Sequence, residues 1–123
     1  MNVVITIQGE FCDLNTYIAA LNKNRYAANE IKQTETDRVA WQCKGLPKMN
    51  HVQVDFDWYC SNKKKDKDNI AFGKKFILDG LVKAGVIPND GWNNIESFTD
   101  SFNIDKDNPR VKIYIEEVSD EKI

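Results

Sequence analysis

Apolar and polar residues alternate most regularly along residues 51–60, HVQVDFDWYC. The even-numbered positions of this segment are apolar and most of the positions between them are polar, so an extended chain would bury one face and expose the other. A strand is therefore predicted here. Residues 3–8 are rich in β-branched side chains and predict a first strand, and residues 111–115 alternate and predict a last one. A weaker strand is expected near residues 95–102.

Helical spacing occurs in three other segments. A helix is predicted to begin at Asp13, which suits the N-cap position and precedes apolar residues three or four positions apart. A second helical stretch covers about residues 27–43, and the pattern leaves open whether it continues the first helix or forms a separate one. A third helix is predicted for residues 70–84, because its apolar residues are periodic and Gly85 suits the position just after a helix.

These elements predict one α+β domain over residues 1–123, with a mixed sheet of about four strands packed against two or three helices. A chain of this length, 41% of it hydrophobic, can build one modest core. It shows neither a basic leader before an apolar run nor a long apolar stretch, so we expect a cytoplasmic protein with no membrane segment. The three cysteines form no CxxC pair and are expected to be reduced and mostly buried.

Charge is unevenly distributed along the chain. The formal net charge of −2 argues against a general nucleic-acid coat protein. Residues 63–83, however, carry seven lysines against three aspartates, whereas residues 84–123 carry four cations against nine acids. A basic segment that also holds carboxylates is what a metal-dependent enzyme acting on phosphodiesters would need, although an ordinary charged surface would give the same counts.

Asp66 and Asp68 are the first candidates for metal ligands. They are separated by one residue, between the strand predicted at 51–60 and the helix predicted at 70–84, so both carboxylates can point the same way and attract a cation. Carboxylates and waters suit the octahedral coordination of Mg²⁺. A helix cap would explain Asp68 or Asn69 equally well.

The third predicted helix adds a basic candidate. Lys75 is spaced to share a helical face with Asp68 and Asp79, while Lys74 points elsewhere. Lys75 could therefore meet a phosphate held by a metal at Asp68, or it could simply pair with Asp79 on the surface. Asp90 lies in the loop VIPNDGW, where an aspartate usually serves a turn.

Two other kinds of site are excluded by the residues themselves. The tetrapeptide Asp-Lys-Asp-Asn occurs at 66–69 and at 105–108, but neither copy has the ligands and the glycine that a calcium-binding EF-hand loop needs. His51 is the single histidine of the sequence, so a histidine-based nuclease or zinc site lacks its partners. Any hydrolysis would then depend on carboxylates and a hard cation.

Four segments of the chain are informative when taken together. They are KKDKDNI at 64–70, KKFILDGLVKAGVIPNDGW at 74–92, DKDNPRVKIYIEEV at 105–118 and, more weakly, LNTYIAALNKNRYAANEIK at 14–32. Their combination resembles the RusA family of Holliday-junction resolvases, particularly its phage and prophage branch. A few more residues separate Asp66 from Asp79 than in the best-known branch of the family, so both Lys74 and Lys75 are candidates for the family's lysine, and helical phase favours Lys75.

The resemblance implies a RusA-like endonuclease that resolves four-way DNA junctions by symmetric paired nicks and acts as a homodimer. It also implies that Asp66, Asp68 and Asp90 are catalytic acids that bind Mg²⁺, or Mn²⁺ in its place, and that Lys75 is the essential basic residue. Trp41 or Trp92 could contribute to the dimer interface, and packing in the core would explain them as well.

Phosphate contacts are expected mainly from the lysines of the turn after residue 60, which could equally be a solvated turn. Two further functions stay open: a non-catalytic branched-DNA-binding or phage accessory protein with the same fold, and a small protein-interaction domain unrelated to DNA. Metal-dependent nicking would separate the enzyme from both. The candidate phosphate contacts are Lys63, Lys64 and Lys65, with Lys32 and Arg25 as weaker ones.

Overall fold

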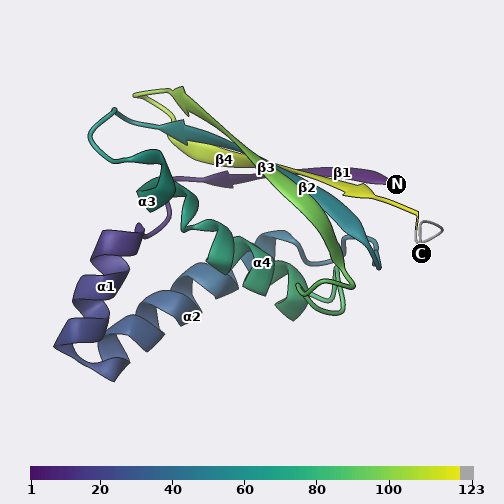
Figure 1. Ribbon diagram of the computed structural model, residues 1–123, viewed down its shortest axis with the longest axis horizontal. Coiled ribbons are helices and arrows are strands. Elements are labelled where there is room, and N and C mark those ends of the chain that lie inside the picture. The colour runs from purple at the N-terminus through teal and green to yellow at the C-terminus, as the bar shows by residue number, and fades with distance from the viewer. Residues whose placement is uncertain (120–123) are drawn as a thin grey trace.

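The computed structural model describes residues 1–119 and has a four-stranded mixed sheet with the helices on one face (Figure 1). The strand order is β1-β4-β2-β3. β4 pairs antiparallel with β1 and with β2, whereas β2 and β3 run parallel. The strands are β1 (Asn2–Gln8), β2 (Val52–Cys60), β3 (Ile95–Ile104) and β4 (Arg110–Glu117), and the helices are α1 (Leu14–Lys23), α2 (Arg25–Gln42), α3 (Lys67–Ala71) and α4 (Lys74–Lys83).

The predicted strands are confirmed, and the weakest of them is the longest. β2 alternates as expected, with its even-numbered residues buried and its odd-numbered residues partly exposed. β3 has ten residues and alternates weakly because it lies at the edge of the sheet, where most of its side chains are exposed. β2 and β3 are joined through α3 and α4, the kind of crossover that a parallel pair requires.

The first helical region forms two helices, which answers the question that its sequence left open. Asp13 caps α1 as expected, because its carboxylate accepts a hydrogen bond from the backbone N–H of Thr16 at 2.8 Å. α1 ends at Lys23, and Asn24 then adopts an extended conformation (φ −172°) and accepts from the N–H of Ala27. A polar residue that caps the first turn of α2 therefore divides the two helices.

The prediction of one helix for residues 70–84 is wrong, because the segment is interrupted. α3 begins earlier, at Lys67, and the α-helical hydrogen bonding is interrupted at Phe72 and Gly73, which keep helical backbone angles, before α4 starts. Gly73 lies against Phe11, and a Cβ added to this glycine would be 2.8 Å from the Phe11 Cβ. The break thus accompanies a close contact with a distant part of the chain. Within residues 1–119 the three longer helices α1, α2 and α4 are joined by the five-residue α3, and the predicted α+β class with a four-stranded mixed sheet is confirmed.

The core lies between the helices and the inner face of the sheet. α2 and α4 approach closely because Gly80 lies against Val39, where an added Cβ would come within 2.5 Å of the valine side chain. All three cysteine thiols are free, and only Cys12 is partly exposed. Trp41 and Trp92 are exposed, so core packing does not explain them. No helix within residues 1–119 is long and apolar enough to cross a membrane.

Candidate metal and nucleic-acid site

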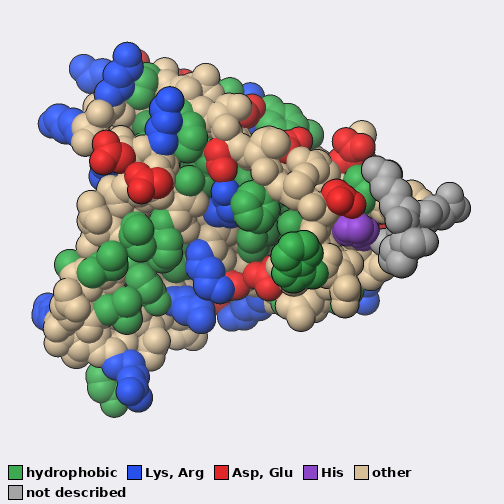
Figure 2. Space-filling model, viewed as in Figure 1, with side chains coloured by type: hydrophobic (Ala, Val, Ile, Leu, Met, Phe, Trp, Pro, Cys, Tyr) green, Lys and Arg blue, Asp and Glu red, His purple; other side chains and the backbone are tan. Residues whose placement is uncertain are grey.

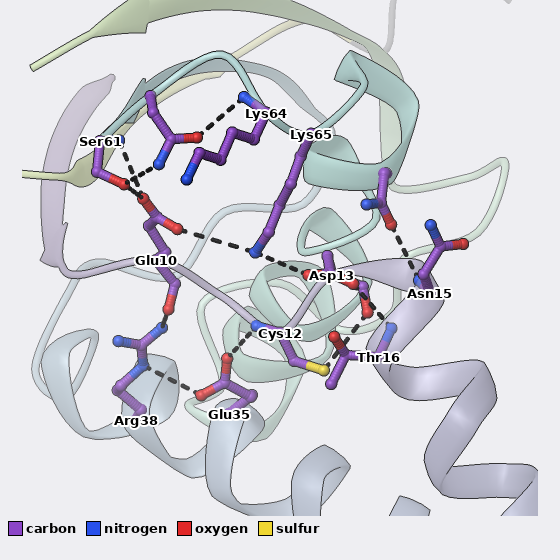
Figure 3. Close-up of polar contacts among 12 residues, drawn as sticks. Glu10, Cys12, Asp13, Asn15, Thr16, Glu35, Arg38, Ser61, Lys64 and Lys65 are labelled. Carbon is purple, nitrogen blue, oxygen red and sulfur yellow. Dashed lines mark hydrogen bonds and ion pairs between the residues drawn. The ribbon is translucent and has the colours of Figure 1, made fainter.

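The loop between β2 and α3 carries the lysine run and is held against the segment between β1 and α1 (Figure 3). Glu10 accepts hydrogen bonds from the N–H and from the hydroxyl of Ser61, at 3.0 and 2.7 Å. Asn62 closes a tight turn by accepting from the N–H of Lys64 at 2.9 Å. The loop is therefore fixed both by its own turn and by a carboxylate from a distant segment.

Lys65 ties this loop to the start of α1. Its ammonium lies 2.7 Å from the Asp13 carboxylate and 4.0 Å from that of Glu10 (Figure 3). The hydrogen bond with Asp13 raises the pKa of Lys65. Burial raises the pKa of Asp13, but hydrogen bonds from Lys65 and Thr16 outweigh burial and hold that pKa below its ordinary value of 3.8. Of the three loop lysines, Lys65 is thus the one engaged by carboxylates of its own chain.

Asp66 and Asp68 lie at the start of α3 with exposed side chains. Asp66 occupies the N-cap position, yet its carboxylate makes no capping hydrogen bond. Asp68 lies in the first turn and accepts from the N–H of Asn69 at 3.0 Å. Asn69 accepts from the N–H of Asn15 at 2.9 Å, which fixes α3 against the start of α1. The interpretation of Asp68 or Asn69 as the helix cap is therefore wrong, because the helix begins before both residues.

An open groove runs beside these two carboxylates, between the loop, α3 and the last residues of β3. Lys67 reaches toward β3, with its ammonium 5.7 Å from the centre of the Phe102 ring. Figure 2 shows Lys and Arg side chains projecting from the corner of the molecule above α3. The groove thus combines carboxylates, which suit a hard cation, with ammonium groups, which suit phosphate. The charged residues that line it are Lys63, Lys65, Asp66, Lys67 and Asp68.

Lys75, the expected catalytic lysine, makes an ion pair across one turn of α4. Its side chain is 56% exposed, and its ammonium lies 3.3 Å from the carboxylate of Asp79. The expectation that it shares a helical face with Asp68 is wrong, because the break at residues 72–73 places the two residues on separate helices. Helix geometry therefore gives Lys75 no special relation to the paired aspartates.

Lys74 has the more enclosed position. Its side chain is 15% exposed, and its ammonium lies 2.6 Å from the Asp100 carboxylate and 4.2 Å from the centre of the Phe98 ring. Asp100 also accepts from the indole N–H of Trp58 at 2.8 Å. Asp100 and Phe102 occupy alternate positions of β3, so Lys74 lies about 7 Å along the strand from the groove.

Asp90 lies at the other end of the sheet from Asp66 and Asp68. It precedes β3, whose first residue pairs with Val52 at the start of β2, whereas the other two aspartates follow Cys60 at its end. The nine residues of β2 span about 26 Å at roughly 3.3 Å per residue. Within residues 1–119, no three histidine, cysteine or acidic side chains are grouped so that they could hold a metal. One chain by itself does not bring the three expected aspartates together.

Lys32 and Arg25, the weaker candidates for phosphate contacts, lie on α2 away from the lysine loop. Arg25 follows the turn after α1, whose ten residues rise about 15 Å from Asp13. Lys32 lies near the exposed ion pair between Asp37 and Lys83. The structure therefore separates both residues from the groove beside α3.

Sequence reasoning missed Glu10 and Asp100, because the importance of each depends on a contact with a distant segment. Neither residue belongs to a motif or a periodic pattern that would mark it. Neither a scan against protein-family models nor a search of curated proteins found a match for this chain. The function is therefore inferred from the carboxylates of Asp66 and Asp68, from the lysines around them, and from the resemblance of several sequence motifs to the RusA family.

Proposed function

We propose that this protein is a Mg²⁺-dependent, structure-specific DNA endonuclease of the RusA type, which resolves four-way junctions by symmetric paired nicking during recombination and repair. It would act in the cytoplasm of a bacterial or phage-infected cell. One observation carries the proposal: Asp66 and Asp68 present exposed carboxylates beside a groove lined by lysines. Lysines alone would suit DNA binding, whereas adjacent carboxylates repel DNA unless a cation neutralises them. The combination favours metal-dependent cleavage over binding alone.

The two carboxylates fit the coordination habits of Mg²⁺. This ion is commonly held by one or two carboxylates together with waters and substrate phosphates. Asp66 and Asp68 are open to solvent, and the contact between Asn69 and Asn15 keeps the backbone of α3 in place. Bound there, Mg²⁺ or Mn²⁺ would supply the Lewis acidity that activates a water and offsets charge on the scissile phosphate.

The lysines would bind and orient the DNA backbone. Lys63 and Lys64 are exposed on the loop, and Lys67 lies on the groove. Lys65 would hold the loop in place through Asp13. Phosphate contacts of this kind give an affinity that falls as salt rises.

The roles of Lys74 and Lys75 can be distinguished by experiment, because one side chain is enclosed and the other is exposed. The Lys75 side chain is 56% exposed, so its ammonium is available to offset charge on a phosphate, whereas the Asp79 carboxylate that it approaches is mostly enclosed. Lys74 neutralises Asp100, which is mostly enclosed. We expect Lys75→Met to lower cleavage, and we expect Lys74→Met to lower the free energy of unfolding more than Lys75→Met does, because Lys74 is the more enclosed of the two lysines. Equal cleavage by Lys75→Met and the unaltered protein would contradict a role for Lys75.

The test of the proposed function is cleavage of a labelled synthetic four-way junction with and without Mg²⁺. We expect Asp66→Asn and Asp68→Asn to lose cleavage by about 100-fold or more while still binding the junction. Asp37→Asn is the matched control, because it removes the same charge from an exposed ion pair on α2. Full activity of Asp66→Asn would overturn the assignment of the site.

The position of Asp90 favours a second candidate, a non-catalytic branched-DNA-binding or phage accessory protein with the same fold. Within residues 1–119, one chain groups only two of the three expected acids, and a protein that only binds DNA would need no third. Tight junction binding without nicking in Mg²⁺ would support this candidate. A protein-interaction domain unrelated to DNA would show neither binding nor nicking.

A further inference from the structure

A pocket lies beneath the lysine loop, between the end of β2, the segment that follows β1 and the start of α3. It meets the groove beside Asp66 and Asp68 at this loop, because Asn62, Lys65 and Ile70 line both. The centre of a water-sized sphere can occupy about 50 Å³ of the pocket, several times the roughly 10–15 Å³ that one water requires. The pocket can therefore hold a group larger than a water, next to the surface proposed to bind the DNA backbone.

The wall of this pocket combines apolar and charged side chains. Phe11 and Trp58 are buried aromatic residues, and Val111 adds a buried aliphatic one. Glu10 and Lys65 bring opposite charges to the same wall. Apolar walls with a few converging polar groups are the usual construction of a site for a small ligand. The composition of the wall therefore suits a flat, partly apolar ring that also carries hydrogen-bonding groups.

Glu10 and Lys65 present an acceptor and a donor that a ligand can bridge (Figure 3). Glu10 Oε1 accepts both hydrogen bonds from Ser61, whereas Glu10 Oε2 lies 4.0 Å from the Lys65 ammonium, too far for a direct hydrogen bond. The hydrogen bonds from Ser61 hold the pKa of Glu10 below 4.5, so this carboxylate is ionised at neutral pH. The Lys65 ammonium binds Asp13 at 2.7 Å and has more than one N–H to donate. A group with a donor beside an acceptor would satisfy both side chains.

Nucleobases carry this pair of groups on a flat ring. The Watson–Crick edge of every base has a donor next to an acceptor, such as the amino group and N3 of cytosine. Proteins that take up a single base read this edge by hydrogen bonds and hold the ring between aromatic or apolar side chains. In a duplex the edge is paired and the ring is stacked, and the free energy needed to release a base is smallest where it is already unpaired. An unpaired base therefore fits this pocket better than a paired one.

We infer that this pocket holds one unpaired nucleobase of the bound DNA, whose Watson–Crick edge donates to Glu10 and accepts from Lys65. The inference rests on the proposed function, because it needs DNA in the groove beside α3. The lysines of that groove, Lys63 and Lys67, favour a base that is attached to a phosphate backbone over a free nucleoside. The pocket would make the protein select branched DNA with an unpaired nucleotide over fully paired DNA.

Two labelled four-way junctions test the pocket by fluorescence anisotropy without Mg²⁺, so that binding is measured without cleavage. One carries a single unpaired nucleotide beside the branch point, and the other carries an abasic nucleotide at the same place. We expect the abasic junction to bind about tenfold more weakly to the unaltered protein. Glu10→Gln and Lys65→Met should each reduce this ratio to about threefold or less, because each removes one contact with the base. Equal affinity of the unaltered protein for both junctions would overturn the inference.

Lys64→Met is the matched control for Lys65→Met. Lys64 lies on the same loop, and its backbone N–H keeps the turn with Asn62 after the substitution. The loss of this ammonium should weaken the binding of both junctions by the same factor, so the ratio of the two affinities should stay at about tenfold. A purely structural role of Lys65 would also weaken both junctions alike. Identical ratios for Lys64→Met and Lys65→Met would therefore contradict the base pocket.

Deoxynucleoside monophosphates distinguish a base of the DNA from a free nucleotide. They should shift the amide resonances of residues 58–62 only at millimolar concentration, because they lack the rest of the phosphate backbone. Binding as tight as that of the junction would assign the pocket to a free nucleotide and overturn the inference. Junction nicking with no preference for the unpaired nucleotide would overturn the pocket and leave the proposed function intact. If no junction binds, the proposed function fails, and the pocket fails with it unless a monophosphate shifts these resonances in the unaltered protein and not in Glu10→Gln.

Discussion

The two ends of the parallel pair β2–β3 are built in different ways. At the end that carries the lysine loop, side chains make the decisive contacts, as Glu10 binds Ser61 and Lys65 binds Asp13. At the opposite end, backbone groups and a neutral amide contribute as well: the N–H of Met49 donates to the carbonyl of Val86 at 2.7 Å, and the side-chain amide of Asn94 donates to the carbonyl of Asn50 at 2.7 Å. The ion pair at that end, between His51 and Glu96, is longer, at 3.5 Å. Ionic side-chain contacts respond to pH and salt, whereas backbone contacts respond to packing. The end proposed to meet DNA has the shorter ion pair, between Lys65 and Asp13, so its structure should depend more on salt.

The same comparison explains why Asp90 lies far from Asp66 and Asp68. In a parallel pair, the last residue of the first strand and the first residue of the second strand lie at opposite ends of the two strands. Asp66 and Asp68 follow β2 and Asp90 precedes β3, so the topology itself holds them apart within one chain. Within residues 1–119, the three acids therefore do not form one site in a single chain.

The largest expected effect comes from disturbing α4, which extends beneath the sheet between the two ends. Gly80→Ala would place a Cβ within 2.5 Å of the Val39 side chain and 3.1 Å of the carbonyl oxygen of Thr36, so α2 and α4 would have to move apart. We expect the free energy of unfolding to fall by about 1–3 kcal/mol, measured by urea denaturation. Gly91→Ala is the matched control, because no atom lies within 4 Å of its added Cβ. Equal stability of the two variants would contradict the close packing of α2 on α4.

The pattern of apolar and polar residues predicted the helices and strands well where one face of the element is buried. The alternation of residues 51–60 and the caps at Asp13 and Gly85 correspond to β2, α1 and the end of α4. The break at Gly73 could not be predicted in this way, because it reflects a close contact with Phe11 rather than a local preference. Sequence spacing alone therefore placed Lys75 and Asp68 in one helix rather than in α4 and α3.

The candidate site was predictable only in part. Asp66, Asp68 and the neighbouring lysines are close in sequence and stay close in space. The separation of Asp90 could have been foreseen from the topology, since two strands joined by a helical crossover run parallel. The ion pair of Lys74 with Asp100 could not, because it depends on the register of an edge strand that alternates weakly.

A smaller effect is expected when the lysine end is titrated with acid. The pKa values of Asp13 and Glu10 lie below their ordinary values of 3.8 and 4.5, so their contribution to stability is present above those values and is lost as the pH falls through the lower folded-state values. Lys65→Met removes one source of this shift. We expect it to lower the free energy of unfolding at pH 7 by about 0.5–1 kcal/mol and to reduce the loss between pH 5 and pH 3.

Lys64→Met is the control for this titration. Lys64 lies on the same loop, but its interaction with Asn62 is made by the backbone N–H, which the substitution retains. Its urea-denaturation curves should therefore follow those of the unaltered protein at each pH. Identical acid profiles for Lys65→Met and Lys64→Met would contradict the proposed anchoring of the loop by Lys65.

The smallest expected effect concerns single lysines in junction binding. Lys64→Ala should weaken binding a few-fold and reduce the slope of log affinity against log salt by about 0.9, the value for one lost phosphate contact on duplex DNA. Lys32→Ala removes the same charge from α2, away from the groove, and should leave that slope unchanged. Fluorescence anisotropy with a catalytically inactive Asp68→Asn background would measure both slopes without cleavage. A larger change for Lys32→Ala than for Lys64→Ala would move the DNA-binding surface from the loop to α2, because the salt slope counts only the phosphates that a side chain neutralises.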